Sequence, residues 1–266
     1  MAGRVIVVTS GKGGVGKTTT VANIGTGLAL RNKKVVMIDA DIGLRNLDVV
    51  MGLENRIVYD LVDVAEKTCR SISKALIKDK RLGNLFLLPA AQTRNKDAIT
   101  PEQMVAIVDE LKDDFDYVLI DCPAGIERGF NNAVAAAAEA IVITTPEISA
   151  VRDADRIIGL LQEKEIYDPV LVLNRLRPEM VRKGDMMDVD DINDILAIKL
   201  LGIVPDDEEI IISTNKGEPA VLNAHSKAGE AFRNVVRRME GEEVPFMSVD
   251  GEPGLFGRFL KILQGK

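Results

Sequence analysis

Residues 11–18 read Gly-Lys-Gly-Gly-Val-Gly-Lys-Thr, and they follow an apolar run, residues 5–9, that has the length of a buried strand. A helical pattern begins at the end of this octapeptide, at Lys17. A strand, a glycine-rich loop and a helix in this order are the context of a phosphate-binding P-loop. Glycine lets the backbone curl so that successive N–H groups point at phosphate oxygens, and the helix N-terminus adds a positive dipole end. The alternative, a glycine-rich turn that matches by chance, does not account for the flanking strand and helix.

Apolar runs and helical patterns continue to alternate along the rest of the chain. Seven runs rich in Val, Ile and Leu predict buried strands, at residues 5–9, 35–39, 85–89, 117–121, 140–145, 170–174 and 201–204. Five stretches have helical spacing, at residues 17–30, 101–112, 131–139, 151–162 and 224–239. Strands that alternate with helices form βαβ units, and their right-handed crossovers produce a mainly parallel sheet. The predicted fold class is α/β, with a single doubly wound sheet, helices on both faces and one P-loop domain over residues 1–239.

Composition narrows the class of protein. The net charge of −7 over 266 residues argues against a broad nucleic-acid surface, although a local basic patch remains compatible with it. Two cysteines, Cys69 and Cys122, are too few and too far apart for a disulfide scaffold or a zinc site, and a reducing cytoplasmic compartment fits them. The opening residues lead directly into an apolar strand, so no signal peptide is expected. No apolar run is long enough to span a bilayer, and any membrane contact is expected to be peripheral.

Backbone and side chains have different tasks in the predicted P-loop. Lys17 is expected to reach the β- and γ-phosphates of a nucleotide, and the Thr18 hydroxyl to bind Mg²⁺. Lys12 follows the first loop glycine and comes too early to share the role of Lys17. The residues expected to contact the nucleotide here are Gly11, Lys12, Gly13, Gly14, Val15, Gly16, Lys17, Thr18 and Thr19.

Carboxylates stand at the ends of two predicted strands. Asp39 closes the run at 35–39 and Asp41 follows two residues later, and Asp121 closes the run at 117–121 in the manner of a Walker B aspartate. Ligands of open α/β sheets bind at the carboxyl ends of the strands, so Asp121 is expected to hold Mg²⁺. Acidic residues also open ordinary loops, and the P-loop upstream is what favours the functional interpretation.

The last segment differs in kind from the domain before it. Residues 240–253 break all periodicity and are predicted to be a tether, and residues 254–266 form an amphipathic pattern with Arg258 and Lys261 opposite its apolar face. The apolar residues of this pattern are Leu255, Phe256, Phe259, Leu260, Ile262 and Leu263. A helix of this kind can lie in the interface of an anionic membrane or dock on the protein body. The tether and the terminal position favour the membrane, where two copies held together would gain avidity of about 10²–10⁴ over one.

Several segments together resemble the MinD family of division-site regulators, a branch of the deviant Walker A ATPases. Besides the loop at 11–19 and the tail, they are Asp-Ile-Gly-Leu-Arg-Asn-Leu-Asp at 41–48, Asn-Arg-Ile-Val-Tyr-Asp at 55–60 and Pro-Glu-Ile-Ser-Ala-Val-Arg-Asp at 146–153. The resemblance implies that Lys12 reaches across a dimer interface to the partner's nucleotide, as an arginine finger does. It also implies that Asp41 orients the attacking water, that Asp39 supports the Mg²⁺ shell, and that Gly125 lies in a second switch near the γ-phosphate.

The same resemblance implies the remaining sites and the biological role. Asn174, Pro205 and Asp206 are expected to bind adenine, and Ser149, Arg152 and Asp153 to contact the dimer partner and other partners. The family implication is an ATP- and Mg²⁺-dependent homodimer at the cytoplasmic face of the inner membrane, or in the stroma of a plastid. There it recruits a MinC-like division inhibitor, and in many relatives a MinE-like activator releases it.

Three other classes share the ATP site. A ParA-type DNA-partitioning ATPase would bind DNA through lysine and arginine, which the acidic balance and the tail weigh against. An FlhG-like regulator of flagellar number also carries a membrane helix, so sequence reasoning leaves it open. A nitrogenase-type iron protein needs cysteines that bridge a cluster between subunits, and Cys122 alone does not supply them.

Overall fold

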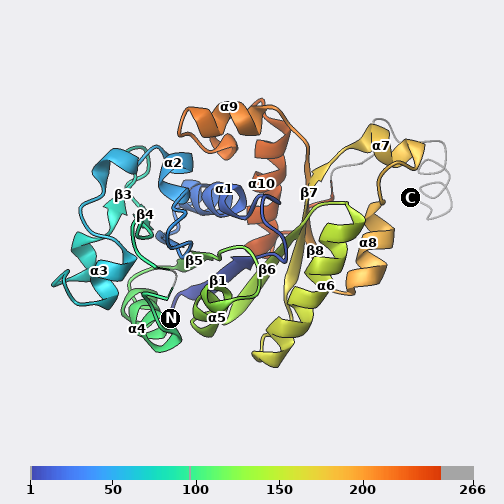
Figure 1. The fold of residues 1–266 in the computed structure, drawn as a ribbon. Coiled ribbons are helices and arrows are strands. Elements are labelled where there is room, and N and C mark those ends of the chain that lie inside the picture. The colour runs from blue at the N-terminus through green and yellow to red at the C-terminus, as the bar shows by residue number, and fades with distance from the viewer. Residues whose placement is uncertain (1, 96, 247–266) are drawn as a thin grey trace.

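The computed structural model describes residues 2–95 and 97–246 of the 266-residue chain, and an eight-stranded sheet lies at its centre (Figure 1). The strand order is β3-β4-β2-β5-β1-β6-β7-β8, and every neighbouring pair is parallel except β3 with β4. The strands are β1 (Arg4–Thr9), β2 (Val35–Asp39), β3 (Ile77–Lys78), β4 (Leu85–Leu88), β5 (Tyr117–Asp121), β6 (Glu139–Thr144), β7 (Val170–Leu176) and β8 (Lys199–Pro205). The predicted α/β class with a mainly parallel sheet is confirmed.

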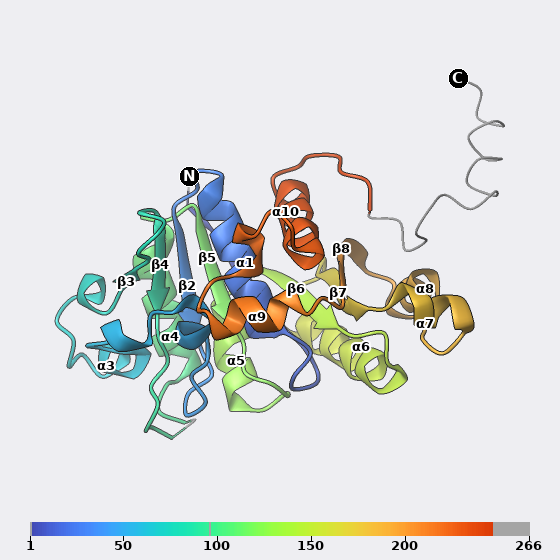
Figure 2. The ribbon, with the colours of Figure 1, turned by 90° about the horizontal axis from the view of Figure 1, so that it is seen from above.

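Helices cover both faces of the sheet, as Figures 1 and 2 show from two sides. One face carries α1 (Lys17–Leu30), α2 (Leu47–Met51), α9 (Glu209–Asn215) and α10 (Lys227–Met239). The other carries α3 (Leu61–Ala65), α4 (Pro101–Lys112), α5 (Arg128–Ala135), α6 (Ile148–Glu163) and α8 (Val189–Leu196), with α7 (Pro178–Lys183) beside them. Three short 3₁₀ turns, Glu54–Arg56, Ile72–Lys74 and Ala220–Leu222, complete the described elements.

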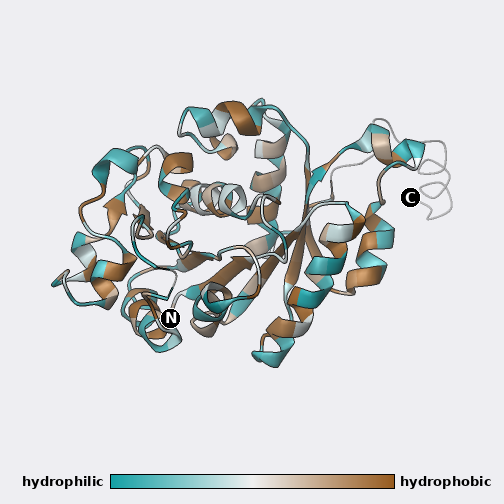
Figure 3. Cartoon of the chain, viewed as in Figure 1, coloured by the Kyte–Doolittle hydropathy of each residue, from teal (hydrophilic) through white to brown (hydrophobic). Residues whose placement is uncertain are grey.

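Two hydrophobic cores lie between these layers. Along β1, Val5 and Val7 pack into one core, whereas Ile6 and Val8 pack into the other, because successive side chains of a strand point to opposite faces. Both faces are covered, so the strand reads as continuously apolar in sequence. Figure 3 shows the same pattern, with hydrophobic strands in the interior and polar residues on the outer faces of the helices.

Some predicted boundaries were wrong. The helix expected at 131–139 begins earlier and ends at Ala135, because Glu139 already belongs to β6, where its carboxylate pairs with Arg4 at 2.6 Å. The helix expected at 224–239 begins at Lys227, since the Ser226 hydroxyl accepts a bond from the Gly229 N–H and caps it. The short elements α2, α3, α7, α9 and β3 were not predicted, because runs of two to seven residues leave no clear period.

The described start of the predicted tether is held by the body. Glu240 pairs with Lys33 at 2.7 Å and accepts a hydrogen bond from the Tyr117 hydroxyl. The Arg238 guanidinium donates to two carbonyls of the segment 244–245 and stacks on the Phe246 ring at 4.2 Å. The predicted amphipathic helix at 254–266 lies outside the described residues. Among the helices that are described, none is long and apolar enough to cross a membrane.

Candidate functional site

The loop between β1 and α1 has the backbone that a phosphate cradle requires. Gly14 and Gly16 adopt the left-handed region, with φ of 78° and 101°, which costs other residues strain. A Cβ on Gly16 would lie 2.3 Å from Asn174 Nδ2, and one on Gly11 would lie 2.3 Å from the Asp153 carbonyl oxygen. Glycine is therefore required at position 16 both to form the turn and to let β7 approach the loop, and at position 11 to let α6 approach it.

Lys17 places a nearly buried cation beneath this loop. The side chain is only 8% exposed, and its ammonium donates to Ser10 Oγ at 3.1 Å. Its positive charge also lowers the pKa of Asp121, against a larger rise caused by burial. A lysine held close to a glycine-rich loop by a single neutral hydroxyl can accept a phosphate as its counter-ion.

Two carboxylates from adjacent strands meet below the loop. Asp39 ends β2 and Asp121 ends β5, and the two residues are register partners in the parallel ladder. Asp39 is 1% exposed and accepts hydrogen bonds from the backbone N–H groups of Asp41, Asn46 and Leu47, at 3.0, 3.2 and 3.1 Å. Asp121 is 2% exposed, and its Oδ1 has no hydrogen-bond partner among the described residues.

Burial of this pair makes the site attractive to a cation. Burial raises the pKa of Asp39 to about 6, opposed by the three backbone N–H groups. The pKa of Asp121 is raised well above its ordinary range by burial and then by the negative charge of Asp39. A divalent cation would relieve both effects, because it compensates the charge that the interior disfavours.

The donor set fits Mg²⁺ shared with phosphate. Among the described residues, no group of three or more His, Cys, Asp and Glu is placed to hold a metal ion alone. Mg²⁺ takes oxygen ligands and keeps several waters, so one or two carboxylates together with substrate phosphates usually suffice. The orphaned Asp121 oxygen and the neighbouring Thr18 hydroxyl, which lowers the pKa of Asp121, meet that requirement.

The two predicted switch segments face each other beyond these carboxylates. A small cavity is lined by residues 40–42 on one side and, on the other, by residues 123, 124 and 127 of the β5–α5 loop with residues 129 and 130 of α5. Gly125 in that loop has φ of 92° and no atom within 4 Å of where a Cβ would stand, so its backbone remains approachable. Cys122 is buried, and burial raises its pKa to about 12, which excludes a reactive thiolate at neutral pH.

The residues expected to bind adenine share one cavity of about 660 Å³. Asn174, Pro205 and Asp206 line it together with Gly16 and Thr19 of the phosphate loop. β7 continues past Asn174 to Leu176, so this residue lies within the strand and does not end it as predicted. Its side-chain amide donates to the Val15 carbonyl at 2.7 Å, and this bond joins β7 to the phosphate loop.

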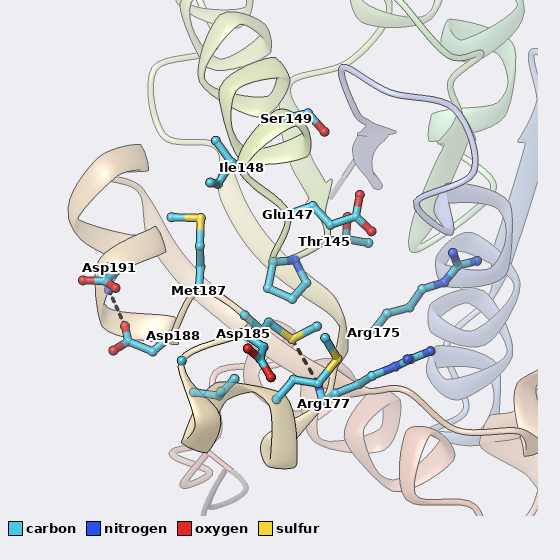
Figure 4. Close-up of a pocket in the computed structure, with 15 residues that line it drawn as sticks. Thr145, Glu147, Ile148, Ser149, Arg175, Arg177, Asp185, Met187, Asp188 and Asp191 are labelled. Atoms are coloured by element: carbon cyan, nitrogen blue, oxygen red, sulfur yellow. Dashed lines mark hydrogen bonds between the residues drawn. The ribbon is translucent and has the colours of Figure 1, made fainter.

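Sequence reasoning missed two arginines of the site. Arg177 donates to the Asp206 carboxylate from Nε and from Nη2, both at 2.6 Å, and both residues line the cavity. Arg175 has an unusual left-handed φ of 58° for a non-glycine residue. Both also line an adjoining cavity of about 870 Å³ between α6 and the α7–α8 segment (Figure 4). Neither has a sequence signal beyond its position just after the strand predicted at 170–174.

Lys12 turns toward the start of α6 in its own subunit. Its ammonium lies 3.3 Å from Glu147 Oε2 and 3.2 Å from Ser149 Oγ, on the surface. Ser149 was expected at a partner surface, whereas Glu147 was not singled out. Asp153 packs its backbone against Gly11, so the predicted partner region and the phosphate loop are in direct contact.

Comparison with known proteins agrees with this geometry. A family model described as an AAA domain matches residues 3–168. The septum site-determining protein MinD of Synechocystis sp. is 64% identical over 245 residues, which are 92% of each chain. MinD in the MinC:MinD cell division protein complex of Aquifex aeolicus is 49% identical, with a TM-score of 0.86 over 92% of this chain and 98% of that one. MinD of Pyrococcus horikoshii, solved with Mg-ADP, is 30% identical, with a TM-score of 0.80 over 89% of this chain and 96% of that one.

Proposed function

The chain belongs to the MinD family of septum site-determining proteins, and on that premise we propose that it is a Mg²⁺-dependent ATPase that switches between monomer and dimer. The observation that carries the proposal is the juxtaposition of the nearly buried Lys17 with the paired carboxylates of Asp39 and Asp121, below a glycine loop. A relative of known structure holds Mg-ADP, and the donor groups of this site suit that ligand.

The residues divide the chemistry among themselves. Lys17 and the loop N–H groups neutralise the β- and γ-phosphates, and the adenine lies in the cavity formed by Asn174, Pro205 and Asp206. Thr18 and Asp121, supported by Asp39, would hold Mg²⁺, which compensates charge on the phosphates when bound. Asp41 orients the attacking water. Phosphoryl transfer needs little more, since positioning and charge compensation supply most of the catalysis.

Lys12 makes the dimer part of the active site. In one subunit it rests on Glu147 and Ser149, with its side chain 43% and the Glu147 side chain 61% exposed. Exposed ion pairs contribute only about 0–1 kcal/mol, so this contact is readily exchanged for a partner's phosphate. A cation supplied by the second subunit then stabilises the transition state, and hydrolysis depends on protein concentration.

Dimerisation also controls membrane binding and the recruitment of a partner protein. Two copies of the segment at 254–266 hold an anionic bilayer where one copy dissociates, because avidity multiplies two weak contacts. The face near Ser149, Arg152 and Asp153 recruits a MinC-like inhibitor of cell division, and a MinE-like activator releases the dimer. Support for the inhibitor comes from a relative that was solved together with MinC.

The test is co-sedimentation with vesicles that contain anionic lipid, in ATP, in ADP and without nucleotide. The full chain is expected to sediment in ATP only, and a variant that lacks residues 254–266 is expected to hydrolyse ATP slowly yet stay in the supernatant. Lys17→Ala is expected to lose both activities because the phosphates lose their buried cation. Equal sedimentation of the full chain in all three conditions would overturn the switch.

A further inference from the structure

Three segments far apart in sequence meet at Arg81, away from the phosphate loop and from the proposed Mg²⁺ site at Asp39 and Asp121. Its Nη2 donates to the Met51 carbonyl and its Nη1 to the Gly217 carbonyl, each at 2.9 Å. The same guanidinium pairs with the Asp79 carboxylate at 2.8 Å. Asp79 is 5% exposed and also accepts the N–H groups of Arg81 and Leu82. Arg81 thus bridges the ends of α2 and α9 from the connection between β3 and β4.

The bridged backbones are in tight contact. Gly52 caps the C-terminal end of α2, and Gly217 follows α9, with φ of 64° and 65°. A Cβ on Gly217 would lie 2.5 Å from Gly52 Cα, and one on Gly52 would lie 2.9 Å from the Gly217 carbonyl oxygen. No side chain fits between them, so a shift of one helix end must displace the other.

Each bridged helix begins at an opposite end of the nucleotide site. The first residue of α2, Leu47, donates its N–H to Asp39 at the proposed cation end. The N-terminus of α9 follows Asp206 of the adenine cavity, and Asp207 accepts the Glu209 N–H at 3.0 Å. α2 has five residues and α9 has seven, so only a short helix separates the Arg81 contacts from each end of the site.

We propose that Arg81 is a positioning residue that couples the adenine end of the site to the cation and switch end through the Gly52–Gly217 contact. This inference rests on the proposed nucleotide function and deepens it. Adenine that binds against the β8–α9 loop fixes the position of α9. Because Arg81 and the Gly52–Gly217 contact join α9 to α2, α2 and the N–H groups that orient Asp39 are then fixed as well. Arg81 touches neither substrate nor cation itself.

A planar guanidinium suits this task because it donates in several fixed directions at once. The pKa of Asp79 agrees with a tightly engaged bridge: burial raises it, but the Arg81 guanidinium and backbone N–H groups lower it below the ordinary value. A lysine at this position could replace the charge but not the simultaneous bonds to two carbonyls and a carboxylate.

The test is a comparison of ATP with GTP as substrates of the full-length protein. Arg81→Ala is expected to lower kcat/KM for ATP by about tenfold, in the range typical of coupling between sites, and kcat/KM for GTP by less than about threefold. GTP lacks the adenine whose binding the bridge is proposed to transmit, so the loss of the bridge should lower kcat/KM for GTP less. Arg81→Lys is expected to resemble Arg81→Ala. Arg56→Ala is the matched control, because the Arg56 guanidinium donates to the Lys78 carbonyl at 2.7 Å, whereas the Arg81 guanidinium donates to the Met51 and Gly217 carbonyls.

A purely structural role makes a different prediction. Loss of folded protein would reduce the apparent rates with ATP and with GTP by the same factor. Assays well below the melting temperature of each variant would remove most of that reduction. Equal losses for ATP and GTP, or full recovery in Arg81→Lys, would overturn the inference and leave the proposed ATPase intact. A wild type that hydrolyses no ATP would overturn both.

Discussion

Replacing Asp39 by asparagine is expected to change how stability depends on pH in the absence of metal. The carboxylate is 1% exposed, and its pKa of about 6 lies above the ordinary value of 3.8. The native state therefore holds a proton between about pH 4 and 6 that the unfolded state has released. Stability falls as pH rises through that window, because the unfolded state then binds fewer protons than the native state.

The size of the effect follows from the shift. A difference of about two pKa units lowers the free energy of unfolding by about 3 kcal/mol at neutral pH, and it has no effect below about pH 4. In a domain of this size that is about 6–12 °C in Tm. Asp121 acts in the same direction, since burial and the charge of Asp39 raise its pKa as well. Asp39→Asn removes the buried charge of Asp39 and with it the repulsion that raises the pKa of Asp121.

Thermal unfolding in EDTA at several pH values between 4 and 8 measures the effect, in wild type and in Asp39→Asn side by side. The asparagine cannot accept all three backbone N–H groups equally well, which lowers its stability by a constant amount. The informative quantity is the difference in Tm between the two proteins. It should shift in favour of Asp39→Asn as pH rises from 4 to 7 and then level off.

Mg²⁺ with ADP provides the internal control. A bound cation compensates the buried charge, so the pH dependence attributed to Asp39 should shrink in wild type. A difference in Tm that stays constant from pH 4 to pH 8 would show that Asp39 ionises normally, and the argument for a cation site from buried charge would be wrong.

Three further outcomes follow from single contacts. Asp41→Ala should slow hydrolysis by at least about 10²-fold yet retain ATP binding, measured by single turnover and by equilibrium titration; unaltered turnover would exclude its role. Gly202→Ala should destabilise the fold by about 1–3 kcal/mol in denaturant unfolding, because the new Cβ would lie 2.2 Å from Val235 Cγ2, and Val235→Ala in the same chain should recover part of the loss. Thr100→Ala should cost about 1 kcal/mol, since Thr100 and Gln103 form the capping box of α4; no change in the denaturant midpoint would contradict this.

Local sequence determined the phosphate loop and most of the long elements. Glycine at positions 14 and 16 satisfies a backbone conformation that depends only on neighbouring residues, so its purpose is readable without a fold. The buried strands were likewise predictable as short continuous runs of Val, Ile and Leu, α1 from its place directly after the phosphate loop, and α4 from helical spacing over its twelve residues. Short elements such as α2 and α9 carry no such signal and depend on the surfaces that they cover.

Only the tertiary structure decided which residues meet and what their environment does to them. Asp39 and Asp121 become register partners because β2 and β5 are neighbours in the sheet, and their shifted pKa values come from burial that no strand has by itself. The contact of Lys12 with Glu147, and the bridge that Arg81 forms, join segments separated by more than a hundred residues. Strand order and the close packing of helix ends set such distances, whereas sequence patterns report only on neighbours along the chain.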